Sequence, residues 1–100
     1  MQDAGYCRIP LKRRDGTVRG YAIFDQSDAA LGQYPWYLLG GYVGRAVPRP
    51  DGGQTAELMH RVILGLAPGD GLEGDHINLD KLDNRRSNLG VDILDSPSVT

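Results

Sequence analysis

The chain has 100 residues, a length that suits a single domain. Hydrophobic residues make up 40% of it, which excludes a disordered chain, and the single cysteine excludes an internal disulfide and a four-cysteine zinc site. The net charge of −2 is unevenly spread. Residues 1–50 hold seven basic against four acidic side chains, and residues 51–100 hold four against nine. The first half is therefore suited to phosphate groups and the second half to a cation.

Targeting segments are not evident in the sequence. The first residues, Met1–Tyr6, are polar and lack the apolar run of a signal peptide. No apolar stretch approaches the roughly 20 residues of a membrane-spanning helix. We expect a cytoplasmic protein of a phage or a bacterial host, without membrane contact.

The first half of the chain is rich in strand signals. Two strands, Tyr6–Leu11 and Val18–Phe24, flank an Asp15-Gly16 pair that is typical of a hairpin turn. A short helix is predicted over Asp25–Leu31, with Asp25 or Ser27 as its cap. A second strand pair, Pro35–Leu39 and Tyr42–Val47, is expected around Gly40-Gly41, before a turn-rich loop over Pro48–Gln54.

The second half contains the clearest helical pattern. Leu58, Val62 and Leu66 recur at every fourth residue, so the pattern predicts a helix over Thr55–Leu66 that Thr55 caps and Ala67-Pro68-Gly69 ends. Three further elements follow: a short strand over Leu72–Ile77, a polar loop over Asn78–Ser87 with one possible helical turn, and a last strand over Leu89–Leu94.

The residue pair Asp75-His76 carries the chemistry that the sequence suggests. Adjacent strand residues point to opposite faces, so the two side chains must do different jobs. A carboxylate is a hard oxygen ligand for Mg²⁺ or Mn²⁺, and a histidine accepts a proton near neutral pH. Hydrolysis of a phosphodiester needs both functions. A lone histidine at a strand end is nevertheless more often structural, and an Asp/Asn run is usually a turn.

A longer motif surrounds this pair. The segment Gly74–Leu89 (GDHINLDKLDNRRSNL) resembles the core of the phage and intron-type HNH homing endonucleases, which are metal-dependent DNA-cutting hydrolases. The upstream segment Met59–Gly65 is similar to the helix that precedes that core in the family. A weaker likeness to the family's entry segment extends over Ala22–Ala46, and the resemblance as a whole covers residues 9–94.

The resemblance implies roles for the matching residues. His76 would be the general base that activates water, and Asp75 would bind the divalent metal, Mg²⁺ or Mn²⁺ before Zn²⁺ or Ni²⁺. Asn88 matches the middle residue of the H-N-H triad and would brace the loop that holds the histidine. Asn84, Arg85 and Arg86 would lie near the DNA backbone, as guanidinium groups suit phosphate.

Other residues have simpler interpretations. Arg85 and Arg86 can equally be a solvated surface pair, and Arg61 is expected either to form a salt bridge or to touch phosphate. We expect His60 to be structural, with a hydrogen bond that orients the core loop. Three aromatic residues are predicted to belong to the core rather than to stack on bases: Trp36, Tyr37 and Tyr42.

The sequence also departs from the family pattern. The third H-N-H position, which supplies a second metal ligand from a closing helix, falls on Pro97, a residue without a ligand atom in its side chain. Asp92 or Asp95 are possible substitutes. Gly74 replaces a usual apolar residue, and Leu79 replaces a usual turn glycine, so that the turn after His76 is expected to be altered or strained.

These features predict one α+β domain over residues 1–100. Residues 1–54 would form an antiparallel, β-rich part and residues 55–100 an HNH core, a ββα-metal hairpin whose final helix is short or missing. The favoured function is a DNA endonuclease that nicks one strand, since one chain offers one site. The alternative is a degenerate HNH scaffold that binds DNA or a protein, for example a phage accessory or inhibitor protein. A homodimer or a second chain that completes the site is a further alternative.

Overall fold

An antiparallel hairpin begins the fold, in a computed structural model that describes residues 5–13 and 15–93. Its strands are β1 (Tyr6–Lys12) and β2 (Val18–Asp25), as the turn signal predicted. Asp15 shapes the turn because its carboxylate accepts hydrogen bonds from the backbone N–H of Thr17 at 2.9 Å and from its hydroxyl at 2.6 Å.

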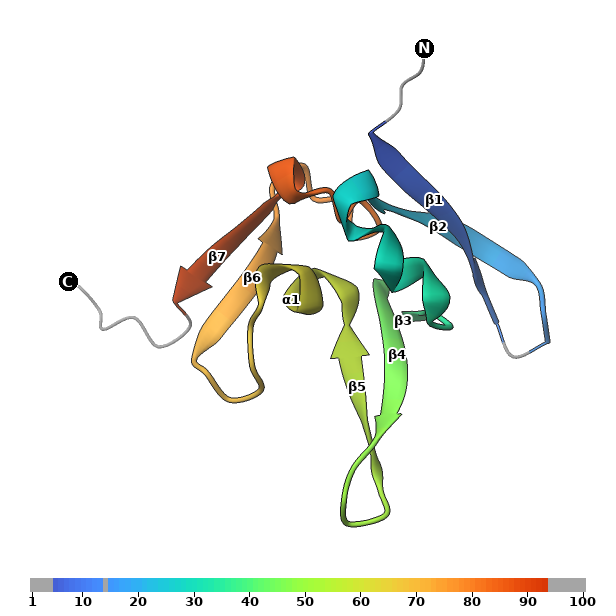
Figure 1. Ribbon diagram of the computed structural model, residues 1–100, viewed down its shortest axis with the longest axis vertical. Coiled ribbons are helices and arrows are strands. Elements are labelled where there is room, and N and C mark those ends of the chain that lie inside the picture. The colour runs from blue at the N-terminus through green and yellow to red at the C-terminus, as the bar shows by residue number, and fades with distance from the viewer. Residues whose placement is uncertain (1–4, 14, 94–100) are drawn as a thin grey trace.

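The hairpin belongs to a five-stranded sheet with the strand order β2-β1-β3-β4-β5 (Figure 1). The remaining strands are β3 (Tyr37–Leu39), β4 (Tyr42–Pro48) and β5 (Gln54–Leu58). The expectation of a purely antiparallel sheet is wrong, because Lys12 of β1 pairs in parallel with Tyr37 of β3 and makes the sheet mixed. The chain between β2 and β3 forms the 3₁₀ helix η1 (Gln26–Gln33), close to the predicted short helix.

The predicted helix over Thr55–Leu66 is only half helical. Its first part is strand β5, whose residues pair antiparallel with β4 from Pro48 to Gly44, so Thr55 caps no helix. The helix α1 spans Met59–Leu64 and ends at Gly65, which takes a left-handed φ of 73°. Pairing with a neighbouring strand thus overrides the local helical periodicity. The β-rich part of the chain accordingly continues to Leu58.

A second, two-stranded sheet contains the HNH-like motif. Its strands β6 (Leu72–His76) and β7 (Leu89–Ile93) pair antiparallel, with His76 opposite Leu89. The predicted helical turn between them is the 3₁₀ helix η2 (Arg86–Asn88). Residue 94, the last of the predicted strand, lies outside the described residues, as do Asp95 and Pro97.

The loop between β6 and β7 reaches back to the first sheet. Ile23 of β2 forms a bridge to Asp83, with hydrogen bonds from Ile23 N to Leu82 O at 2.9 Å and from Asn84 N to Ile23 O at 2.7 Å. Leu82 packs over Gly20, where a Cβ atom would lie 3.1 Å from a Leu82 methyl group. These contacts place the loop at a defined position relative to the five-stranded sheet.

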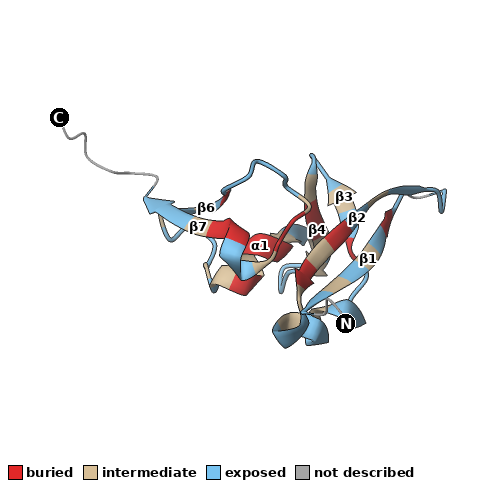
Figure 2. Cartoon of the chain, turned by 90° about the horizontal axis from the view of Figure 1, so that it is seen from above, coloured by how far each residue is buried: buried red, intermediate tan, exposed pale blue. Residues whose placement is uncertain are grey.

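The hydrophobic core lies where α1 meets the inner side of the five-stranded sheet (Figure 2). Trp36 is buried there, as predicted, and its indole N–H donates to Leu31 O at 2.8 Å. Tyr42 is half-buried, whereas Tyr37 is 42% exposed, so the core prediction is wrong for Tyr37. Its strand places it on the outer side of the sheet.

The described part of the chain is therefore a small α+β protein with few and short helices. None of its helices has the length and apolar character that crossing a membrane requires.

Candidate functional site

His76 stands at the end of β6 with its ring 4% exposed. Its Nε2 lies 2.8 Å from Oδ1 of Asn84, whose Nδ2 points to the sulfur of Met59 at 3.5 Å. An amide oxygen only accepts hydrogen bonds, so Nε2 carries the proton of the neutral ring and Nδ1 keeps its lone pair. The environment thus selects the tautomer of His76 that has Nδ1 as its basic atom.

Asn84 is consequently a buried partner of the histidine. The expectation that it touches DNA is not met, because its side chain is 1% exposed and lies in the interior. The backbone N–H of Asn84 donates to Ile23 O on β2. The residue whose side-chain amide orients His76 is therefore anchored on the larger sheet. Nothing in the motif alone distinguishes this inward orientation from an outward one.

Asn88 connects the two ends of the loop. Its Oδ1 accepts from the backbone N–H of Asn78 at 3.0 Å, and its Nδ2 donates to Asp83 O at 2.9 Å. Its own carbonyl accepts from the N–H of Ile77 at 2.8 Å. Asn88 is 7% exposed, and both ends of its side-chain amide are used within the loop, so its contacts are those of a brace.

The turn after His76 contains the altered position that the sequence indicated. Leu79 has a φ of 69°, in the left-handed region, and its side chain is 83% exposed. A non-glycine residue in this region costs about 1–2 kcal/mol. The hydrogen bonds from Leu79 N to His76 O (2.9 Å) and from Asp80 N to Asn78 Oδ1 (2.8 Å) hold the turn in this shape.

Asp83 is a buried carboxylate at the centre of the loop, 3% exposed. It accepts two hydrogen bonds from Arg85, with Nε and Nη2 each at 2.8 Å, and a third from Asn78 Nδ2 at 3.2 Å. The hydrogen bond from Arg85 is the main cause that holds the pKa of Asp83 below its usual range. Arg85 is thus engaged in fixing the loop.

Asp75 is exposed, beside the buried His76 and opposite Gly90 of β7. The alternation of the strand directs the two side chains to opposite faces, as expected. Within residues 5–13 and 15–93, no group of three or more His, Cys, Asp or Glu side chains lies close enough to hold a metal ion. A site with so few protein ligands fits an ion that retains several waters and also binds phosphate oxygens, as Mg²⁺ does.

An aromatic cluster covers the inner side of His76. The ring of His60 lies 4.8 Å from that of His76 and stacks on Tyr42 at 5.4 Å between ring centroids. Burial, followed by the neighbouring charges of His76 and Arg61, lowers the pKa of His60 from 6.5 to about 4, against a raising effect of Asp75. His60 is therefore neutral near pH 7.

Gly74 explains how His60 fits against β6. A Cβ atom at this position would lie 2.5 Å from Cδ2 of His60 and 3.1 Å from a methyl group of Leu64. The glycine thus gives the imidazole its space. The expected hydrogen bond from His60 to the loop is absent among the described residues, and ring packing takes its place. The glycine at position 74, where the family usually has an apolar residue, is the sequence feature that could have predicted this contact.

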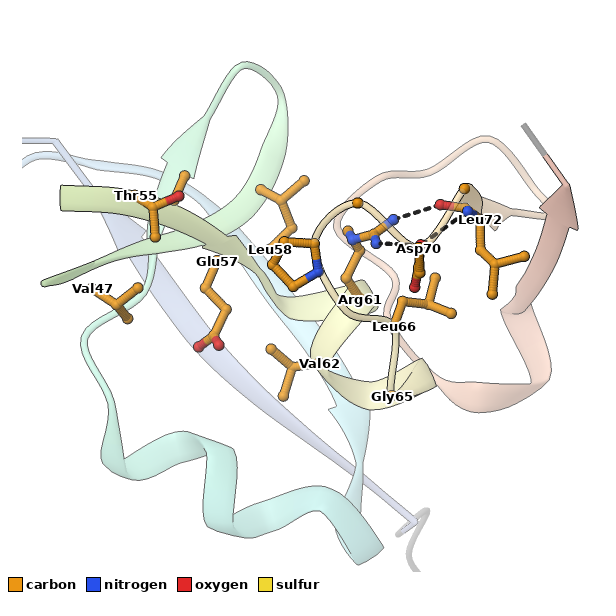
Figure 3. A pocket seen from close by; sticks show the side chains of 14 residues that line it. Val47, Thr55, Glu57, Leu58, Arg61, Val62, Gly65, Leu66, Asp70 and Leu72 are labelled. Carbon is orange, nitrogen blue, oxygen red and sulfur yellow. Dashed lines mark hydrogen bonds and ion pairs between the residues drawn. The ribbon is translucent and has the colours of Figure 1, made fainter. Parts of the chain in front are cut away.

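The arginines assigned to DNA form intramolecular ion pairs. Arg61 stands in the wall of an open pocket of about 670 Å³ between β5, α1 and the loop 65–72 (Figure 3). It donates to Leu72 O at 2.8 Å and Ala67 O at 2.9 Å, and it contacts Asp70 at 3.2 Å. Arg61 therefore forms a salt bridge, which was one of the two expectations for it, and it holds this loop in place.

Arg86 pairs with Asp28 of η1 at 2.8 Å, and its backbone N–H donates to Asp25 Oδ2 at 2.8 Å. The guanidinium groups of Arg85 and Arg86 are partly exposed, at 40% and 58%. Contact of these two groups with DNA stays a prediction, because each would have to share its charge with a carboxylate.

Cations without such partners gather on the first hairpin. Within the described ranges, four basic side chains of β1, β2 and their turn make no ion pair, namely Arg8, Lys12, Arg13 and Arg19. Tyr21 and Tyr6 are exposed on the same hairpin, and Arg8 lies over the Tyr21 ring at 3.7 Å. Basic and aromatic groups together are typical of a surface that contacts nucleic acid.

Comparison of the chain with protein-family models, with curated proteins and with solved structures finds no match in any of the three. The likeness to HNH endonucleases therefore rests on the sequence motif alone.

Proposed function

We propose that the protein is a metal-dependent DNA endonuclease of the HNH type that nicks one strand, with His76 as the general base. The observation that best supports this proposal is the 2.8 Å hydrogen bond between His76 Nε2 and Asn84 Oδ1. A general base needs a fixed orientation and a free lone pair, and this bond supplies both. The loop between β6 and β7 is anchored on β2 of the larger sheet. This supports a ββα-like arrangement of β6 and β7, although the described residues contain no closing helix.

The reaction follows from these positions. Nδ1 of His76 takes a proton from a water molecule, and the oxygen attacks phosphorus while the bond to the 3′-oxygen breaks. The hydrogen bond to Asn84 stabilises the imidazolium that results, because an amide oxygen attracts the charged N–H more strongly. A divalent ion held by Asp75 and by phosphate oxygens would stabilise the charge of the leaving 3′-oxygen.

The DNA duplex is proposed to lie along the first hairpin as well as at His76. The unpaired cations of β1 and β2 neutralise phosphates without first breaking an internal ion pair. Their electrostatic attraction is independent of sequence and weakens with salt. The main DNA contacts would then be made by the first hairpin and not by Arg61, Arg85 and Arg86.

A plasmid nicking assay with Mg²⁺ or Mn²⁺ tests the proposal. Wild-type protein is expected to convert supercoiled into open-circular DNA. His76→Ala should lose at least about a hundredfold in rate, as is typical when a general base is removed. Asp51→Asn, in the distant turn between β4 and β5, is the matched control and should cut at the wild-type rate.

Circular dichroism checks that His76→Ala remains folded, because His76 is buried. Equal cutting by wild type and a folded His76→Ala protein would refute the role of His76. Absence of cutting in both would refute the endonuclease.

One observation favours the alternative of a degenerate HNH scaffold that binds DNA or a protein. In the described ranges, Asp75 belongs to no group of three or more His, Cys, Asp or Glu side chains that could hold a metal. Under this alternative the wild type binds DNA in a gel shift, with an affinity that falls steeply with salt, but does not cut it. A protein-binding scaffold would show neither activity, and a second chain that completes the site would restore cutting.

A further inference from the structure

Lys81 is a cation held beside the His76 site. Its Nζ lies 4.6 Å from the centroid of the Tyr42 ring. Its stem runs over the turn between β3 and β4, where its Cδ and Nζ lie 3.6 Å and 3.7 Å from the position that a Cβ of Gly41 would occupy. The Tyr42 ring and the space left by the missing side chain of Gly41 thus hold the lysine against this turn.

Tyr42 links this cation to the histidine. The Tyr42 ring lies 6.0 Å from the ring of His76 and stacks on His60 with an angle of 22° between the rings. A cation over the face of a tyrosine is attracted by the ring quadrupole and loses part of its freedom. Lys81 is therefore held on the same aromatic ring that lies beside His76.

Lys81 also differs from the other cations of the second half of the chain. Arg61, Arg85 and Arg86 each pair with a carboxylate, whereas Lys81 forms no ion pair with any residue that the structure describes. Lys81 is exposed, so its ammonium group keeps donors for a ligand. A lysine is a compact point charge that binds phosphate oxygens without the fixed fork of a guanidinium.

We infer that Lys81 is the phosphate-binding cation of the His76 site, and that Tyr42 is the positioning residue that holds it there. The ligand is the phosphodiester of the DNA backbone at which His76 acts. This inference rests on the proposed endonuclease function for its catalytic meaning. Binding of the phosphate at this place, however, can be measured without cutting.

The first experiment follows the ring signals of His76 and Tyr42 by NMR while dimethyl phosphate, and then a short DNA duplex, is added to the full chain. Both probes should shift these signals in the wild type. Lys81→Ala should abolish the shifts with dimethyl phosphate, and Lys81→Arg should keep them. Arg49→Ala removes an exposed cation in the distant turn and should leave them unchanged. Unshifted rings in the wild type, or equal shifts in Lys81→Ala, would overturn the inference.

The second experiment measures the single-turnover nicking rate at saturating DNA. Lys81→Ala should lower this rate about tenfold, less than the roughly hundredfold loss typical of a buried oxyanion donor, since Lys81 is exposed. Lys81→Arg should restore most of it. Tyr42→Leu should lower the rate like Lys81→Ala, whereas Tyr42→Phe, which keeps the ring, should not.

The two experiments separate the two proposals. If the wild type cuts, His76→Ala does not, and Lys81→Ala cuts like the wild type, then the inference on Lys81 fails and the endonuclease stands. If the wild type does not cut but the phosphate-induced shifts depend on Lys81, the endonuclease fails and the phosphate site stands.

Discussion

The two hairpins at the ends of the fold are built alike and stabilised differently. The first, β1–β2, turns Leu11, Ala22 and Phe24 inward, and all three are fully buried. The second, β6–β7, contributes Leu89 to the core, but the other buried side chains of its strands and loop are polar: His76, Asp83, Asn84 and Asn88. One hairpin is held by apolar contacts, the other largely by hydrogen bonds.

This difference determines what each hairpin can offer to a partner. Apolar packing needs no charge, so the cations of the first hairpin remain available. The second hairpin uses its charged and amide side chains to build a loop of fixed shape, and its arginines are bound to carboxylates. We infer that the first hairpin attracts DNA phosphates and that the second orients the reactive groups.

Removal of the Asp83 carboxylate is the strongest test of this comparison. Asp83→Ala should lower the free energy of unfolding by about 2–4 kcal/mol, because it removes the buried acceptor that joins Arg85 and Asn78 in the loop. Urea denaturation at neutral pH measures the effect. Asp51→Ala removes an exposed carboxylate paired with Arg49 and should change the same quantity far less than Asp83→Ala does. Similar losses in both variants would show that polar contacts do not hold the second hairpin.

Removal of charge from the first hairpin should affect binding and leave stability unchanged. The double variant Lys12→Gln, Arg19→Gln is expected to bind DNA about three- to tenfold more weakly, and the slope of log affinity against log salt should fall by about one for each lost contact. Fluorescence anisotropy over a range of salt concentrations gives both values. Arg49→Gln is the control, and a double variant that binds like it would remove the first hairpin from the DNA surface.

A further expected effect concerns pH. His60 is neutral in the fold, with its pKa lowered from 6.5 to about 4 mainly by burial, and His76, Arg61 and Asp75 are the charged or titratable groups that act on it. Its contribution to stability is complete above pH 6.5 and is lost as the pH falls from there through about 4. His60→Phe should flatten this part of the stability curve. A wild-type curve already flat between these values would contradict the burial of a neutral His60.

The titration of Asp83 does not interfere with this measurement. Its pKa is lowered from 3.8, so the stability that it contributes is present above 3.8 and is lost at lower pH. The two groups therefore act in separate parts of the pH range.

Much of the fold was predictable from local signals. The turn residues Asp15-Gly16 and Gly40-Gly41 placed two hairpins correctly, alternation identified β7, and the short strand expected over Leu72–Ile77 is β6. The helix prediction over Thr55–Leu66 was wrong in its first part because Thr55–Leu58 pairs with a strand that precedes it by several residues. Such pairing is tertiary and leaves no mark in a periodicity of 3.6. The parallel contact of Lys12 with Tyr37 is hidden for the same reason.

The site was predictable as a list of residues but not as a set of contacts. The motif points to Asp75, His76 and Asn88, whereas Asn84 was expected outside and lies inside. The partner of Arg86 is Asp28, 58 positions away, and no spacing rule connects them. Lys81 and Tyr42, from different halves of the chain, meet only through the fold.

The contact between His60 and Gly74 has an evolutionary consequence. A methyl group at position 74 overlaps the imidazole, so the tolerance of each position depends on the residue at the other. A descendant of this chain that acquires a larger residue at 74 first needs a smaller one at 60, and the reverse order passes through an unstable intermediate. The two positions are thus expected to evolve as one unit, and the order of substitutions restricts the paths open to this site.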